Sequence, residues 1–225
     1  MKAVVLVSGG MDSATLLFHV VKTLGYDEIY ALSYEYGQKH NRELVSAAWQ
    51  CAQLTEVIET KVLDISVYGE ITAGASALTD ENIKVPALDA ISESDLDQPP
   101  TYVPNRNMVM LSLAAAFAES RDCDVIFYGA QAHDQYGYWD CTTEFVERIN
   151  NVFTLNRKNK IRIEAPFAKM KKSDELKLGL DLGVDYSQTW SCYRGAEKAC
   201  GECPTCIERL QAFKEAGITD PLEYE

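Results

Sequence analysis

The first group of residues able to do chemistry is the run Ser-Gly-Gly-Met-Asp-Ser at positions 8–13, between an apolar segment and a helical pattern. Its two glycines have no Cβ, so the backbone can approach a ligand closely, and the free N–H groups of a helix start favour a phosphate. The serines add hydroxyl donors, and Asp12 adds a carboxylate for a Mg²⁺ ion held by phosphates. The run matches neither a Walker A loop nor Gly-x-Gly-x-x-Gly. It predicts a phosphate-binding turn, with a plain capped strand–helix turn as the alternative.

A second group is formed by four of the seven cysteines, spaced as Cys192-x7-Cys200-x2-Cys203-x2-Cys206. Four thiolates with two short gaps suit a tetrahedral Zn²⁺ ion in a closed, structural site. An iron–sulfur cluster is the alternative, although the spacing differs from that of bacterial ferredoxins. The odd number of cysteines and the lack of an export signal argue against a disulfide framework. We therefore expect one structural zinc ion per chain.

Alternating strand and helix patterns must position these two groups. The apolar, β-branched runs predict strands at residues 3–7, 28–34, 56–65, 124–128 and 160–164. Helical periodicity predicts helices at residues 12–24, 41–54, 108–118, 144–155, 173–182 and 204–216. This order predicts an α/β fold whose mostly parallel sheet has helices on both faces. The run at 8–13 then lies at the carboxyl end of a strand, where α/β proteins bind ligands.

The segment 66–101 interrupts the alternation and contains several glycines and prolines. It predicts a long irregular excursion, either a lid or substrate loop or an insertion without such a role. The cysteine-rich end predicts a small appendage. We therefore expect an α/β domain over residues 1–185, which holds the phosphate-binding turn, and a zinc-binding subdomain over residues 186–225.

Composition and charge limit the classes of function. With 21 Lys and Arg against 34 Asp and Glu, the chain carries a net charge of −13 at pH 7. This field repels nucleic-acid backbones, so we expect no nucleic-acid partner, although a local cationic pocket can still bind a small anion. No apolar run is long enough for a secretory signal or a membrane span. A soluble, cytoplasmic protein without a membrane partner is expected.

The run at 8–13, directly after an apolar first strand, resembles the PP-loop of the ATP pyrophosphatases. The resemblance implies a Rossmann-like domain of the adenine nucleotide alpha hydrolase type, in which the loop holds the pyrophosphate of ATP while the α-phosphate is attacked. It implies an ATP-binding set made up of the loop and the first turns of its helix: Val7, Ser8, Gly9, Gly10, Met11, Asp12, Ser13, Ala14, Thr15, Leu16 and Leu17.

Further segments narrow the resemblance: residues 34–40, 102–107, 136–141 and 189–193, in the same order as the PP-loop and the cysteines. Over nearly its whole length the chain resembles the QueC family of 7-cyano-7-deazaguanine synthases. The resemblance implies an ATP-dependent ligase that converts 7-carboxy-7-deazaguanine and ammonia to 7-cyano-7-deazaguanine, a queuosine or archaeosine precursor. An acyl adenylate and then an amide are the implied intermediates. ATP, Mg²⁺ and Zn²⁺ are the implied cofactors, and a homodimer is the implied assembly.

The resemblance also implies roles for individual residues. Asp12, Ser13, Arg106 and Lys172 are expected to act in catalysis, with Arg106 and Lys172 binding phosphate or carboxylate groups. A surface ion pair for Arg106 and a solvated charge for Lys172 are the alternatives. The expected substrate-binding residues are Tyr36, Gln38, Arg106, Asn107, Tyr136, Tyr138 and Asp140. Tyr136, Tyr138 and Trp139 could stack on the deazapurine or only pack against one another, and Asp140 could accept from its amino group.

Two histidines and two departures from the family pattern leave alternatives open. His40 and His133 could assist proton transfer or bond to neighbouring backbone. Residues 131–136 differ from the usual Asn-Ala-x-Asp-Tyr-Ser, and Asn105 stands where glycine is common. The alternatives are an enzyme that joins the deazaguanine carboxyl group to another amine, and a catalytically silent nucleotide-binding protein.

Overall fold

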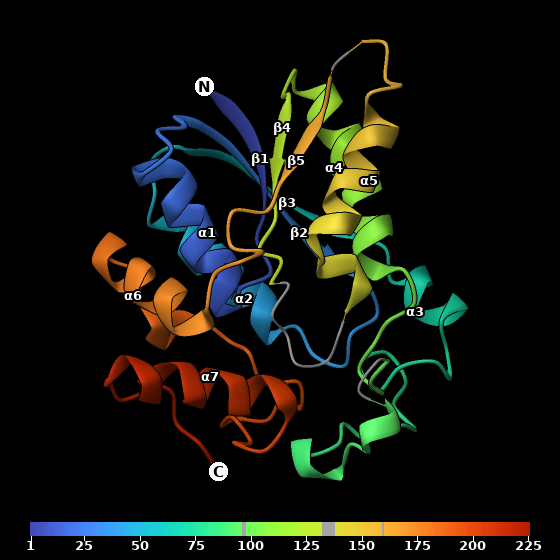
Figure 1. Ribbon diagram of the computed structural model, residues 1–225, viewed down its shortest axis with the longest axis vertical. Helices are drawn as coiled ribbons and strands as arrows, with labels where there is room; N and C mark the ends of the chain where they lie inside the picture. Colours follow the sequence, from blue (N-terminus) through green and yellow to red (C-terminus); the bar gives the residue numbers. More distant parts are fainter. Residues whose placement is uncertain (96–97, 132–137, 159) are drawn as a thin grey trace.

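A five-stranded parallel sheet forms the centre of the computed structural model, which describes residues 1–95, 98–131, 138–158 and 160–225 (Figure 1). Its strands are β1 (Lys2–Leu6), β2 (Glu28–Glu35), β3 (Val57–Asp64), β4 (Val125–Phe127) and β5 (Arg162–Glu164). They are arranged in the order β3-β2-β1-β4-β5, and every neighbouring pair is parallel. The predicted α/β fold with a mostly parallel sheet is confirmed.

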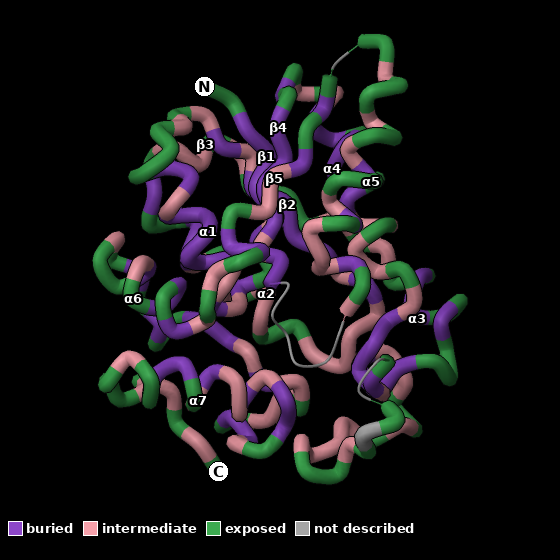
Figure 2. Tube along the Cα trace, viewed as in Figure 1, coloured by how far each residue is buried: buried purple, intermediate pink, exposed green. Residues whose placement is uncertain are grey.

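Both faces of the central strands are buried because β1, β2 and β4 alternate their side chains between two cores, whereas the edge strand β3 leaves Ile58 and Val62 exposed. In β1, Ala3 and Val5 enter one hydrophobic core, whereas Val4 enters the other. The first core is covered by α1 (Met11–Lys22), α2 (Arg42–Ala52), α6 (Lys172–Leu182) and α7 (Pro204–Ala216). The second is covered by α4 (Arg106–Ser120) and α5 (Thr143–Phe153). Buried segments accordingly run through the strands and the inner sides of the helices (Figure 2).

The excursion after β3 has little regular structure, as predicted. It contains the short helix α3 (Val67–Ile71) and two 3-10 turns, Leu88–Ala90 and Glu93–Asp95. Two further 3-10 turns lie at Trp139–Cys141 and Tyr186–Gln188. The excursion is tied to distant parts of the chain, since Lys39 donates from its backbone to Leu78 and Leu88 donates to Glu202. It therefore packs beside the segment after β2 and the cysteine region.

The strand order places a topological switch at β1, which pairs with β2 on one side and β4 on the other. Chain segments that leave the carboxyl ends of β1 and β4 diverge there and open a crevice, where ligands bind in folds of this kind. The loop at 8–13 follows β1 directly. None of the helices in the described parts of the chain is long and apolar enough to span a membrane.

The C-terminal segment is anchored to the body by a buried ion pair. Arg209 of α7 donates from Nε and Nη2 to the Asp220 carboxylate at 2.8 and 2.9 Å, and from Nη1 to Thr189 Oγ1 at 2.7 Å. The side chains of Arg209 and Asp220 are only 1% and 3% exposed. Phe213 of the same helix lies in the first core. The domain division at residue 185 stays a prediction, because α7 packs directly against that core.

Asp220→Ala should lower the free energy of unfolding by about 3–5 kcal/mol, because it leaves the Arg209 guanidinium buried without its counter-charge. Urea denaturation of the variant and the parent measures this difference. Glu223→Ala is the matched control: it removes the exposed ion pair with Lys198 and should change stability by less than about 1 kcal/mol. Equal effects of the two substitutions would contradict a structural role for the buried pair.

Candidate active site

A cavity of about 300 Å³ lies at the carboxyl ends of β1, β2 and β4. Its lining includes residues 6–8 at the end of β1, residues 32–34 and 36 in and after β2, and residues 128–131 after β4. Further walls come from α2, α4, α6 and α7 and from the segment before the cysteine cluster. The cavity therefore occupies the topological switch point, and it brings together segments that are far apart in the sequence.

The loop between β1 and α1 depends on a glycine at position 9. Gly9 has φ of +91°, in the left-handed region that side chains disfavour. A Cβ there would lie 1.9 Å from the backbone oxygen of Glu43 and 2.8 Å from the backbone nitrogen of Ala47. The loop therefore packs directly on the backbone of α2. Gly10, by contrast, has φ of −76°, and a Cβ there would meet no atom closer than 3.6 Å.

Donors of the loop converge on one point. The backbone N–H groups of Ser8 and Gly9 both donate to Ser13 Oγ at 3.1 Å, and this hydroxyl donates to the Gly10 carbonyl at 3.1 Å. Ser8 Oγ lies 3.1 Å from the same oxygen. The start of α1 adds the partial positive charge of a helix N-terminus. The Ser13 hydroxyl therefore holds the loop together, and the helix start offers its partial positive charge to an anion.

A chain of charges crosses the cavity wall from α1 to α7. Lys172 Nζ lies 3.3 Å from Asp12 Oδ2 and 3.4 Å from Glu208 Oε2. Burial raises the pKa of Glu208, whereas the charge of Lys172 lowers it. Asp12 Oδ1 is buried and has no hydrogen-bond partner among the described residues. An unpartnered carboxylate oxygen beside a phosphate-binding loop fits a hard cation such as Mg²⁺.

Arg106 forms the cationic centre of the opposite helix layer. It is the first residue of α4, and its Nη1 donates to Tyr36 Oη at 3.3 Å. Burial disfavours its charged form, but the facing Tyr36 and Tyr193 phenols and the Asp140 carboxylate raise its pKa overall. The guanidinium therefore stays charged inside the cavity. A surface ion pair, the alternative interpretation of Arg106, is not what the structure shows.

Asp140 and Asn107 fix the start of α4. The carboxylate of Asp140 accepts the Asn107 backbone N–H at 3.2 Å, and the Asn107 side chain donates to the Asp140 carbonyl at 3.3 Å. Burial raises the pKa of Asp140, whereas the Arg106 charge lowers it. Asn105 precedes the helix at φ 57°, ψ 24°. Asparagine is one of the few residues that tolerate this conformation, so it can replace glycine here without changing the backbone.

Glu43, in the first turn of α2, contributes a carboxylate that the sequence analysis did not identify. Burial raises its pKa to about 7, although the Arg106 charge and a hydrogen bond with the Gln38 side chain act in the opposite direction. Gln38 is itself fixed, since its Oε1 accepts the Tyr36 backbone N–H at 2.7 Å and its Nε2 donates to the Tyr34 carbonyl at 3.2 Å. The cavity thus contains a carboxyl group that changes protonation near neutral pH.

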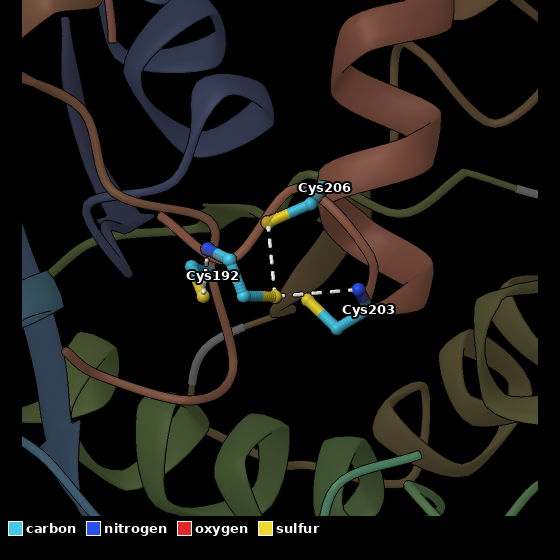
Figure 3. Close-up of side chains that lie close together, drawn as sticks. Cys192, Cys203 and Cys206 are labelled. Atoms are coloured by element: carbon cyan, nitrogen blue, oxygen red, sulfur yellow. Dashed lines mark hydrogen bonds between the residues drawn. The ribbon is translucent and has the colours of Figure 1, made fainter. Parts of the chain in front are cut away.

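The four clustered cysteines lie together, as their spacing predicts. Their Sγ atoms are all within 4.8 Å of one another, and all four residues are buried. Figure 3 shows Cys203 and Cys206 at the start of α7 and Cys192 on the neighbouring segment beside them. Sulfurs bound to tetrahedral zinc at about 2.3 Å lie about 3.8 Å apart, so small movements would close the shell. The set of four sulfur donors fits a metal ion that prefers thiolates.

Local donors favour thiolates in this cluster. The backbone N–H groups of Arg194 and Cys200 point at Cys192 Sγ at 3.4 Å, and that of Cys203 points at Cys200 Sγ at 3.3 Å. Hydrogen bonds among the thiols lower the pKa of Cys203, which also caps the N-terminus of α7, and raise the pKa values of Cys192 and Cys206. The cluster is therefore prepared to bind a cation.

The cysteine region forms one wall of the cavity. Trp190 donates from its backbone N–H to the carbonyl of Gly9 at 2.9 Å, which joins this region to the phosphate-binding loop. The Arg42 guanidinium of α2 stacks over the Trp190 ring at 3.9 Å. Ser191, Tyr193, Thr205 and Glu208 complete this side of the lining. A structural change in the cysteine cluster would therefore also move this wall of the cavity.

The expected ATP-binding residues divide into two groups. Six of them line the cavity: Val7, Ser8, Gly10, Met11, Asp12 and Ser13. The others are absent from the lining that the described residues form. Gly9 shapes the loop, and the fully or nearly fully buried Ala14, Thr15, Leu16 and Leu17 face the core. These last four position the loop, and a ligand-binding role for the set stays a prediction.

The expected substrate-binding residues lie together wherever the structure describes them. Those that line the cavity are Tyr36, Gln38, Arg106, Asn107, Tyr138 and Asp140. Tyr136 and His133 fall outside the described residues. Trp139 is outside the cavity lining of the described chain. Its indole N–H donates to Tyr102 Oη at 2.9 Å, and its ring packs edge-on against Phe145, which favours the packing alternative.

His40 lines the cavity and hydrogen-bonds with the backbone of Cys192 and Tyr193. Burial lowers its pKa, and these bonds oppose that shift. His40 Nδ1 is buried without a hydrogen-bond partner among the described residues, so both alternatives for this histidine stay predictions. Besides Glu43, the sequence analysis missed Glu208 and Tyr193 as cavity residues. No local pattern marks them, because each reaches the cavity only through the packing of α2 or of the cysteine region.

Comparisons with known proteins complete the picture. The family model described as "Queuosine biosynthesis protein QueC" matches residues 2–217. A protein of Caldicellulosiruptor bescii named 7-cyano-7-deazaguanine synthase is 50% identical over 225 residues, which cover all of this chain and 98% of that protein. One of the same name from Thermoplasma acidophilum is 46% identical over 228 residues, covering all of this chain and 92% of that protein.

Among solved structures, an NMN synthetase from Francisella tularensis superposes with a TM-score of 0.51 at 16% identity. The match covers 96% of this chain and 77% of that one. At this identity the likeness concerns the fold alone. It agrees with the α/β architecture predicted from the sequence.

Gly9→Ala should lower the free energy of unfolding by at least about 2 kcal/mol, since it adds left-handed strain and a clash with the α2 backbone. Gly10→Ala is the matched control and should cost no more than about 1 kcal/mol. Denaturant unfolding of the two variants checks the difference. If Gly9→Ala proved as stable as Gly10→Ala, the loop would not pack on α2 as described.

Proposed function

The chain belongs to the QueC family of queuosine biosynthesis proteins, and from this premise we propose that it converts 7-carboxy-7-deazaguanine and ammonia to 7-cyano-7-deazaguanine with ATP. The predicted family is confirmed, and with it the prediction of an enzyme of that family. The observation that carries the specific reaction is the cavity itself. It places a phosphate-binding loop, the Lys172 ammonium group and the Arg106 guanidinium around one space.

The cations and donors of the cavity fit two anionic partners. The Ser8 and Ser13 hydroxyl groups and the α1 N-terminus suit the phosphates of ATP. Arg106, which is held at the start of α4, suits a carboxylate as a planar bidentate donor. With the carboxylate beside the α-phosphate, adenylation needs positioning and charge neutralisation more than a protein nucleophile. Cys141 lines the cavity but is not required to attack the substrate.

The cavity also offers groups that suit a planar base. Tyr36 and Tyr138 supply aromatic faces, and Asp140 supplies a carboxylate acceptor for an exocyclic amino group. Asp140 already accepts the Asn107 N–H through Oδ2, which fixes its orientation. We assign deazaguanine recognition to these residues. The bound Mg²⁺ would be held by Asp12 and the phosphates and would neutralise charge on the phosphates.

Mass spectrometry of a reaction with 7-carboxy-7-deazaguanine, ATP, Mg²⁺ and ammonium should detect the amide and then the nitrile. Asp12→Ala should slow pyrophosphate release at least about 100-fold, because it removes a carboxylate from the phosphate site. Asp181→Ala, an exposed change on α6, should leave the rate unchanged. Neither amide nor nitrile from the parent enzyme would refute the reaction, and conjugation to an added amine would favour the alternative enzyme.

The metal of the cysteine cluster is proposed to be zinc with a structural role. Elemental analysis should give about one zinc ion per chain. Cys203→Ser should lose the metal and lower the thermal midpoint, because the cluster joins α7 to the wall of the cavity. Cys123→Ala, in the second core, is the control and should keep the metal. Iron with visible absorbance in the purified protein would overturn the assignment.

Assembly and location follow from the same family. A homodimer in the cytoplasm, with no nucleic-acid or membrane partner, stays our proposal. The net charge of −13 supports the absence of a nucleic-acid partner, because it repels phosphate backbones. The proposed substrate is also a free small molecule.

A further inference from the structure

Formation of a nitrile from ammonia requires a base inside the cavity. Ammonia carries three hydrogens and the nitrile nitrogen carries none, so three protons must leave the same nitrogen. A positioned side chain typically accelerates such a proton transfer 10²–10⁴-fold. The group must be near the reacting carbon and must both accept and release a proton near neutral pH.

Most carboxylates of the cavity are already committed. Asp12 and Glu208 share Lys172 between them. Asp140 accepts the Asn107 N–H and lies beside the Arg106 charge at the start of α4. Glu43 differs from these three, because no ion pair holds its carboxylate within the described part of the chain. Its partners are the Gln38 amide group and, at longer range, the Arg106 charge.

Glu43 is also placed close to the phosphate-binding loop. A Cβ on Gly9 would touch the Glu43 carbonyl, so the first turn of α2 lies directly on the loop. The Glu43 side chain lines the same cavity as the loop and Arg106. An acyl group that is adenylated at the loop and held by Arg106 would lie between the loop and the start of α4. Glu43 would therefore be beside its reacting carbon.

We propose that the Glu43 carboxylate is the general base that removes protons from the attacking nitrogen, an inference that rests on the proposed function. In amide formation the ammonia nitrogen bonds to the acyl carbon, the carbon–oxygen bond to AMP breaks, and AMP leaves with that electron pair. Glu43 takes one proton from the nitrogen. Each proton passes from Glu43 to solvent before the next transfer.

In nitrile formation the amide oxygen attacks the α-phosphate of a second ATP, and pyrophosphate leaves. The nitrogen loses one proton to Glu43 as a carbon–nitrogen double bond forms. The carbon–oxygen bond then breaks, and AMP leaves. Loss of the last N–H proton to Glu43 supplies the electron pair of the third carbon–nitrogen bond. No group is oxidised or reduced in these steps.

The electrostatic surroundings of Glu43 decide its behaviour with pH. The charged or titratable groups that act on it are Arg106 of α4 and Tyr36 after β2. Asp12, Lys172 and Glu208 line the same cavity as a mutually paired set. With a pKa raised to about 7, Glu43 is protonated in part of the molecules at neutral pH. It can therefore return to either protonation state between steps.

The pH dependence of folding stability tests the raised pKa of Glu43 without an activity measurement. The pKa of Glu43 is higher in the folded protein than in the unfolded chain. The contribution of Glu43 to folding stability is therefore fully present below the pKa of the unfolded chain and is lost as pH rises through about 7. Glu43→Gln removes this loss. The stability of the variant relative to the parent should increase between pH 5 and pH 8 in urea denaturation.

The test compares Glu43→Gln with Glu147→Gln, the same chemical change at an exposed position of α5. ATP–pyrophosphate exchange with 7-carboxy-7-deazaguanine in the absence of ammonia reports the first adenylation alone. Single-turnover formation of amide and nitrile at saturating ammonium reports the proton-transfer steps. The ratio of parent rate to variant rate is measured from pH 6 to pH 9, so that the ammonium–ammonia equilibrium cancels.

For Glu43→Gln we expect exchange within about threefold of the parent and product formation slowed at least about 100-fold. The rate ratio should rise with pH to about 7 and then level. If this variant formed the nitrile at the parent rate, or lost exchange and product formation equally, Glu43 would not be the base. The proposed reaction itself would not be contradicted by either result. A parent enzyme that forms neither amide nor nitrile would instead contradict the proposed function and this inference with it.

Discussion

The absence of a side chain at Gly9 is the constraint on which the rest of the site depends. Its left-handed backbone turns the chain from β1 into α1, and the space that a Cβ would fill is occupied by the backbone of α2. Its carbonyl accepts the backbone N–H of Trp190 from the cysteine region. One residue thus fixes how the loop at 8–13 lies against α2, which carries Glu43, and against the segment that leads into the cysteine cluster.

This arrangement gives the cysteine cluster a functional meaning although it is closed and buried. The cluster anchors the start of α7, which carries Glu208, and Glu208 shares Lys172 with Asp12. The buried pair of Arg209 and Asp220 holds the same helix to the body. The buried cysteine cluster and the buried ion pair therefore both hold one wall of the cavity in place.

Local sequence patterns were enough to predict the strands, most helices, the loop at 8–13 and the cysteine cluster. Each of these is encoded by neighbouring residues: β-branched runs, helical periodicity, a glycine turn and ligand spacing. Glu43 could not be predicted, because its importance arises only when α2 packs on Gly9. Likewise, the raised pKa of Glu43 depends on burial by distant elements. Asn105 differs from the glycine common in the family, and only its left-handed backbone explains why asparagine fits there.

The central claim is that this cavity activates the same carbon twice with ATP. 7-Carboxy-7-deazaguanine labelled with ¹⁸O in both carboxylate oxygens tests it most directly. Attack of the carboxylate, and later of the amide oxygen, on the α-phosphate transfers each labelled oxygen to AMP. Mass spectrometry should therefore find two singly labelled AMP molecules for every nitrile formed. Label released to water or pyrophosphate, or a nitrile formed with only one labelled AMP, would contradict the account.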